Sequence, residues 1–126
     1  MDTKIVYKTF NFLVDTPDSS YNKKFDLDKN IRVVLGLILS SDDPRQLYFR
    51  GSQRLEINGD EIYPEDYESK LLMSGISVPP NEKYQDLGNG VISGNGEIKM
   101  LYKDSSNINS AFGPYKVMLT IKCELK

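Results

Sequence analysis

The sequence of 126 residues contains no histidine, no tryptophan and a single cysteine, and these absences exclude much chemistry. Without histidine the chain lacks the commonest general base and every Ser-His or Cys-His nucleophile pair. One cysteine and no histidine cannot supply the ligands of a zinc site, and Cys123 alone cannot form an internal disulfide. No phosphate-binding loop of the GxxxxGK[ST] type occurs either. We therefore expect no catalytic residues, no metal and no cofactor.

Basic charge and long apolar runs are also scarce. The net charge is −2 and Lys23-Lys24 is the only adjacent basic pair, so nothing marks a nucleic-acid-binding surface. The longest apolar stretch, Val33–Leu39, is far shorter than the roughly 20 residues of a membrane span. The N-terminal residues lack the apolar run of a signal peptide. We expect no nucleic-acid partner, no membrane, and a chain made and folded in a cytoplasm.

What the sequence does contain is alternation with a period of two, which is typical of half-buried strands. The segment 117–125 is the clearest case, and it places Cys123 on the apolar face as a small buried side chain. Gly36 interrupts the most hydrophobic segment and indicates either a bulge or a close approach of another backbone there. The alternating or apolar segments that we expect to be strands are 4–14, 25–27, 31–39 and 97–103.

The segments between these strands carry turn residues. We expect 47–50 and 53–57 to form a hairpin through Gly51-Ser52, and Asn58-Gly59 to turn the chain into 61–63. The segment 64–73 suits either a short helix or an irregular loop carrying an edge strand. Residues 78–96 have the composition of a loop in which Val91-Ile92-Ser93 could pair briefly, and 104–114 have the composition of a polar loop.

The expected fold is therefore all-β: one domain over residues 1–126, a two-sheet antiparallel sandwich of seven to nine short strands. The jelly roll is one form that such a sandwich can take, and at most one short helix is expected. A hydrophobic fraction of 39% predicts a thin core, which suits strands that bury every second side chain.

The predicted strand over 4–14 has apolar side chains on both faces: Phe10, Phe12 and Val14 on one, and Ile5, Tyr7 and Leu13 on the other. Such a strand is either central in its sheet or covered by a neighbouring subunit. Because this composition offers few elements to cover both faces, we expect an apolar patch and assembly with other protein subunits, as a homo-oligomer or within a lattice. The alternative is that the loops 74–96 and 104–114 cover the strand.

Candidate binding residues are the tyrosines and acids beside turn-rich segments: Tyr63, Glu65, Asp66, Tyr67 and Tyr84. Exposed tyrosine is favoured at interfaces, and a row of aromatic side chains would also suit a glycan. Two alternatives stand beside this interpretation. The tyrosines could cap the ends of the sandwich, and the carboxylate pairs Asp60-Glu61 and Glu65-Asp66 could cleave glycosides if a pocket shifted their pKa values.

The run Leu55–Tyr67, followed by Val78-Pro79-Pro80-Asn81 and the segments Tyr102–Asp104 and Tyr115–Val117, resembles small β-sandwich virion proteins of bacteriophages. In such proteins jelly-roll-type domains build capsids, spikes or fibres. The resemblance lies in the overall pattern and composition, and it transfers no residue role. It implies a non-enzymatic virion component that acts by protein–protein assembly and is made in the host cytoplasm. The alternatives are a carbohydrate-binding or receptor-binding module and a cytoplasmic location.

Overall fold

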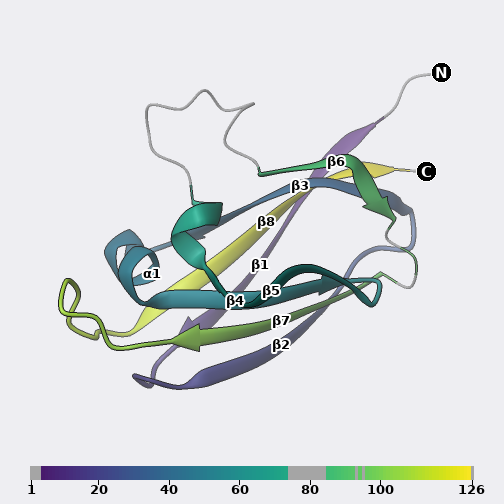
Figure 1. Ribbon diagram of the computed structural model, residues 1–126. Helices are drawn as coiled ribbons and strands as arrows, with labels where there is room; N and C mark the ends of the chain where they lie inside the picture. The colour runs from purple at the N-terminus through teal and green to yellow at the C-terminus, as the bar shows by residue number, and fades with distance from the viewer. Residues whose placement is uncertain (1–3, 74–84, 93, 95, 126) are drawn as a thin grey trace.

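Eight strands form two antiparallel sheets, packed face to face, in the computed structural model, which describes residues 4–73, 85–92, 94 and 96–125 (Figure 1). Sheet A contains, in spatial order, β1 (Ile5–Val14), β8 (Tyr115–Leu125), β3 (Ile31–Ser41) and β6 (Gln85–Ile92). Sheet B contains β2 (Ser20–Asp26), β7 (Glu97–Asp104), β4 (Gly51–Ile57) and β5 (Asp60–Glu68).

The order of the strands defines a jelly roll. The first strand pairs with the last, the second with the second-to-last, and so on inward to the hairpin between β4 and β5. The chain is thus one long hairpin of strands, wrapped so that successive strand pairs alternate between the two sheets. The expected antiparallel two-sheet sandwich is confirmed.

The core lies between the sheets, where alternate side chains of every central strand meet. In β8 the predicted apolar face is buried, including Cys123, which is fully inaccessible. In β7 the side chains of Ile98, Met100 and Tyr102 are buried as the alternation predicts. The pairing of β3 with both neighbours shifts between Val34 and Gly36, so the bulge, one of the two features expected at that glycine, is present.

The expected hairpin over 47–57 is wrong in its first arm, which forms helix α1 (Pro44–Arg50). Pro44 occupies the first helical turn, where its missing N–H costs nothing. Leu47 and Arg50 are buried three residues apart, the spacing of one helical face. Four residues are too few for their sequence to distinguish this pattern from a strand, and only the second arm, β4, is extended.

The helix considered for 64–73 is also wrong over most of its length. The edge strand β5 continues to Glu68, and only Ser69–Leu72 forms a 3₁₀ turn, η1. Pairing with β4 decides this, although β5 bulges where its register with β4 shifts. The expected loop over 78–96 is wrong at Gln85–Ile92, which form β6 and pair with β3, whereas Gly94 lies in a turn as expected. Residues 78–84, 93 and 95 lie outside the described part of the chain.

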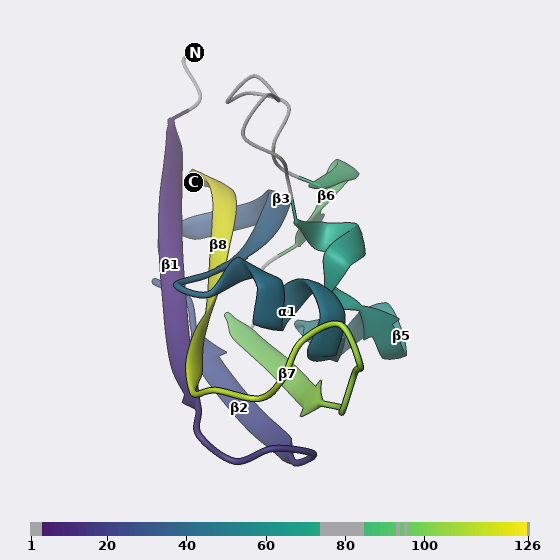
Figure 2. The same cartoon turned by 90° about the vertical axis from the view of Figure 1, so that its left-hand side faces the viewer.

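The expected loop after β7 is confirmed as an irregular segment that packs against α1 (Figure 2). The Arg45 guanidinium donates to the carbonyl of Asn109 from Nε at 2.9 Å and from Nη2 at 2.6 Å. The Gln46 side-chain amide donates to the carbonyl of Ala111 at 2.8 Å. These bonds fix one end of the sandwich.

Candidate functional site

Each sheet has two edge strands, and three of these four edges carry features that discourage pairing with another chain. Strand β5 is bulged and contains Pro64. Strand β2 carries the adjacent charges of Lys23 and Lys24. Strand β6 contains glycines, and its register is broken opposite Gly36 of β3. The fourth edge, β1, is ten residues long, contains no proline and pairs without a register shift.

The main chain of β1 shows which of its groups face outward. The amide of Leu125 donates to the carbonyl of Lys4 at 3.0 Å, and the register pairs β1 with β8 without a break from Ile5 to Val14. In an antiparallel ladder the hydrogen-bonded pairs alternate. The even-numbered residues of β1 therefore direct their N–H and C=O groups toward β8. The odd-numbered residues direct theirs away from β8 to the border of sheet A, where the described residues place no further strand (Figure 2). We call this border the free edge.

The same odd-numbered residues carry the side chains of the outer face. Ile5, Tyr7 and Leu13 are 36%, 54% and 50% exposed. Thr9 and Asn11 lie between them and are also exposed. No side chain of this face is charged. We call the odd-numbered residues from Ile5 to Leu13 the β1 edge.

The inner face of β1 is packed. Phe12 and Val14 are buried in the core, and the Phe10 ring stacks on Phe25 of β2 with centroids 4.8 Å apart. The single charge of the strand, Lys8, is neutralised by Asp28 at 2.6 Å. The two faces of β1 are therefore both apolar, as the sequence predicts, and β1 lies at an edge of sheet A rather than between two of the strands that the structure describes.

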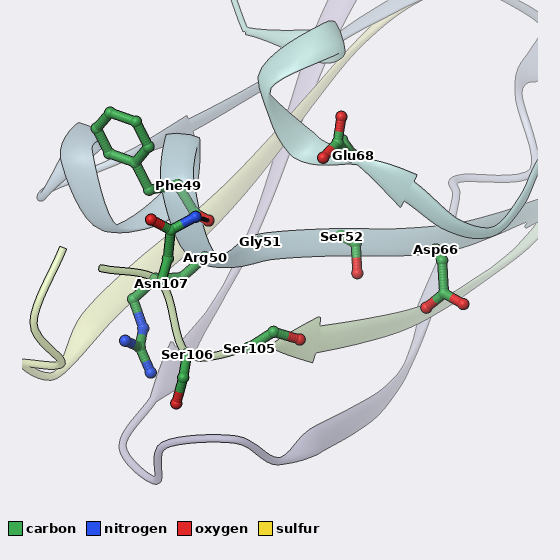
Figure 3. A pocket seen from close by; sticks show the side chains of 9 residues that line it. All are labelled: Phe49, Arg50, Gly51, Ser52, Asp66, Glu68, Ser105, Ser106 and Asn107. Atoms are coloured by element: carbon green, nitrogen blue, oxygen red, sulfur yellow. Dashed lines mark hydrogen bonds between the residues drawn. The ribbon is translucent and has the colours of Figure 1, made fainter. Parts of the chain in front are cut away.

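A second candidate is a polar cleft of about 310 Å³ at the end of the sandwich near α1 (Figure 3). Its lining comes from the end of α1, the neighbouring ends of β4 and β5, and the loop after β7: Phe49, Arg50, Gly51, Ser52, Asp66, Glu68, Ser105, Ser106 and Asn107. Ser52 and Asp66 point to the same side, Ser105 points toward them, and Phe49 points away.

Beneath the cleft, a buried ion pair fixes Arg50. Its Nε and Nη2 donate to the Asp104 carboxylate at 3.1 and 2.8 Å, and its Nη1 donates to the carbonyl of Ser110 at 3.0 Å. The Tyr115 hydroxyl donates to the same carboxylate at 2.6 Å, and the amide of Asp18 donates at 3.0 Å. Because the Asp104 carboxylate neutralises the guanidinium and only 3% of the Arg50 side chain is exposed, Arg50 presents little positive charge to the cleft.

The groups that the cleft offers to a ligand are hydroxyls, an amide and carboxylates. The Ser52 and Ser105 side chains make no hydrogen bond within the described part of the chain. Glu68 pairs only loosely with Lys70, at 3.5 Å. Because the guanidinium is paired with Asp104 and the lining includes Asp66 and Glu68, the cleft disfavours an anion and is suited to a neutral, polyhydroxylated ligand.

The five candidate residues from the sequence are only partly brought together. Tyr63 and Tyr67 stack with ring centroids 4.6 Å apart, but Tyr63 is only 8% exposed, so the pair forms no open aromatic surface. Burial, followed by the neighbouring Tyr67, raises the pKa of Tyr63 to about 12. Glu65 and Asp66 both accept from Lys103, at 2.5 and 3.1 Å.

The remaining candidate, Tyr84, lies outside the described residues. The sequence pattern predicts the apolar faces of β1, but it contains no signal for the polar cleft. Its lining includes Arg50, whose partner is 54 positions away, and serines that no motif distinguishes.

Two further findings concern metal ions and membranes. Within residues 4–73, 85–92, 94 and 96–125, no three histidine, cysteine, aspartate or glutamate side chains gather closely enough to hold a metal ion. Neither α1 nor η1 has the length or the apolar run that crossing a bilayer requires, and the described residues contain no other helix.

No protein-family model matches the chain, and no curated protein or solved structure is detectably similar to it.

Proposed function

We propose that this protein is a non-enzymatic structural subunit that works by assembling with other protein chains, as a component of a bacteriophage virion. The observation that carries the proposal is the β1 edge. It combines outward-pointing main-chain groups with exposed Ile5, Tyr7 and Leu13, and it lacks the proline, bulge or outward charge that blunts an edge. Soluble monomers avoid such edges, whereas assembling subunits use them.

The jelly roll supports the virion setting by analogy, since capsid domains are among the proteins built on it. The same architecture also serves lectins, so the fold by itself does not decide between assembly and binding. The weight of the proposal therefore rests on the edge and on its difference from the other three edges.

Light scattering on the purified chain, with the variant Tyr7→Lys, tests the proposal. The wild type is expected to exceed the monomer mass of 14.3 kDa, and Tyr7→Lys to return to it, because a charge on the outer face of an edge strand opposes pairing. Leu71→Lys is the matched control: Leu71 is 53% exposed but lies in η1, and its variant should assemble as the wild type does. A wild type that is strictly monomeric at tens of micromolar overturns self-assembly.

A second function, binding of a host glycan, is favoured by the polar cleft with its available Ser52 and Ser105 hydroxyls. Glycan-array binding that is lost in Ser105→Val and kept in Ser20→Val, an exposed serine of β2, would support it. The absence of any glycan binding would count against this function, and glycan binding that Ser105→Val leaves unchanged would count against the cleft as its site.

Hydrolysis of that glycan is not part of the proposal. Glu61 pairs with Arg54 at 2.8 Å, and Glu65 and Asp66 pair with Lys103, so each of the three carboxylates acts as an ordinary surface charge. Amide variants of all three are expected to keep every measurable function. A glycan-cleaving activity that one of these changes abolishes would refute the non-enzymatic assignment.

A further inference from the structure

The hydrogen-bonding pattern of β1 restricts how another strand can join it. Only odd-numbered residues direct N–H and C=O groups to the free edge, because the even-numbered ones face β8. An added antiparallel strand must therefore place its own outward-facing residues opposite Ile5, Tyr7, Thr9, Asn11 and Leu13. If the added strand is the β1 of a second copy, odd-numbered residues of one copy lie opposite odd-numbered residues of the other. This condition leaves few possible registers for the pairing of the two strands.

Those registers differ in how much of the edge they pair. A two-fold axis at Thr9 places Ile5 opposite Leu13 of the second copy, Tyr7 opposite Asn11, and Thr9 opposite itself. Every outward-facing residue of the β1 edge is then paired, and the two exposed apolar ends cover each other.

The neighbouring registers are poorer. An axis at Lys8 brings two lysines directly opposite one another, which is destabilising, and leaves Leu13 outside the paired region. An axis at Phe10 leaves Ile5 outside it. Moving the axis further in either direction shortens the ladder again.

We propose that a second copy of this chain pairs with the β1 edge as an antiparallel strand, with the two-fold axis at Thr9. The result is one continuous eight-stranded sheet formed by the two copies of sheet A, with β1 of each copy at its centre. The outer face carries no charged side chain between Ile5 and Leu13, so on that face identical strands meet without like-charge repulsion, and Lys8 of the inner face is paired with Asp28. Such an interface is isologous, as two-fold dimers require.

This inference rests on the proposed function and adds the partner, the direction and the register. A cysteine at Thr9 tests the register directly. Hydrogen-bonded antiparallel residues have Cα atoms about 5.5 Å apart, within the range of roughly 4.4–6.8 Å that a disulfide spans. The native Cys123 is fully buried and does not compete for the cross-link.

The full chain carrying Thr9→Cys is oxidised mildly and run on a non-reducing gel, beside the matched variant Asn11→Cys. Thr9 and Asn11 are both exposed and lie on the same face of β1. In the proposed register the two Asn11 Cα atoms are about 14 Å apart, since they are displaced by four residues along the strand. We expect at least tenfold more disulfide-linked dimer from Thr9→Cys than from Asn11→Cys. A mixture of Tyr7→Cys and Asn11→Cys should cross-link as a heterodimer.

The outcomes separate the two levels of the proposal. If the wild type assembles in light scattering but Thr9→Cys cross-links no better than Asn11→Cys, this register is wrong while assembly stands. Cross-linking that peaks at Asn11→Cys indicates a shifted register and overturns the axis at Thr9. A wild type that stays monomeric, with neither variant cross-linking, overturns both the register and self-assembly. Near-UV circular dichroism of each variant shows that the exposed substitutions leave the fold intact.

Discussion

The buried ion pair between Arg50 and Asp104 predicts that the substitution Asp104→Asn destabilises the fold by about 3–5 kcal/mol. The Asp104 side chain is fully buried and that of Arg50 is 3% exposed. The substitution therefore leaves a guanidinium that neither water nor a carboxylate can neutralise. Because asparagine has nearly the size of aspartate, the free energy lost measures the charge pairing and not the creation of a cavity.

Urea unfolding at neutral pH, followed by far-UV circular dichroism, measures the loss. Since the free energy of unfolding of a single domain is about 5–15 kcal/mol, the variant could retain little stability. The double variant Arg50→Met/Asp104→Leu guards against this, because it removes both charges and is expected to be more stable than Asp104→Asn. Glu61→Gln is the control: it breaks an exposed pair with Arg54 and should cost less than about 1 kcal/mol.

The pH dependence gives an independent test of the same pair. Burial alone raises the pKa of Asp104, but the hydrogen bonds from Arg50 and Tyr115 outweigh it and hold the pKa below its usual value. A depressed folded-state pKa contributes stability above the unfolded-state value of about 3.9, and this contribution is lost as the pH falls through the folded-state value. The wild type should therefore lose stability on acidification more steeply than Asp104→Asn.

Two results would refute this reasoning. One is a loss on Asp104→Asn no larger than that on Glu61→Gln, which would mean that the pair behaves as a surface salt bridge. The other is an unchanged acid dependence in Asp104→Asn, which would mean that another carboxylate is responsible for the acid sensitivity.

Three further predictions concern single buried or strained positions. Gly51→Ala is expected to cost about 1–3 kcal/mol in thermal unfolding, because the new Cβ would overlap the hydroxyl of Tyr102 and the carbonyl of Leu47. Gly59→Ala should cost about 1–2 kcal/mol, since its φ of +79° is strained for alanine although nothing lies within 4 Å of the added atom. Cys123 should resist Ellman's reagent at mildly alkaline pH until urea unfolds the chain, because burial raises the pKa of its thiol to about 11. Rapid modification of the folded protein would contradict the burial.

The strands were predictable from the sequence because a strand with one buried face imposes a period of two on its side chains. That pattern is unbroken in β8 and β7, and both were placed within a few residues. Helix α1 could not be predicted in this way, because its seven residues carry too few apolar positions to reveal a period of 3.6. The helix considered for residues 64–73 failed for another reason. Pro64 and the acids that follow it favour the start of a helix locally, but the pairing of β5 with β4 overrides this preference.

The polar cleft depends on contacts that no local pattern contains. Asp104 meets Arg50 only because the hairpin of strands brings β7 beside β4, and Ser105 reaches the cleft because it follows β7 directly. The sequence shows that Arg50 and Asp104 are present, but their burial and their pairing depend on the strand order, which places β7 beside β4.

The β1 edge is the case in which sequence and topology must be combined. The sequence shows that β1 and β3 are both apolar on their two faces, and it cannot distinguish them. Among the strands that the structure describes, β3 has neighbours on both sides, β8 and β6, whereas β1 is paired with β8 alone. A second copy would supply the missing neighbour. Hydrogen exchange can test this, because the amides of even- and odd-numbered residues of β1 face opposite sides of the strand. The amides of Val6 and Lys8 face β8 and should exchange slowly at any protein concentration. Those of Thr9 and Asn11 face away from β8 and should become protected only as the protein concentration rises. Protection of both sets in a dilute monomer would show that another part of the chain already covers the edge, and it would refute the assembly that we infer.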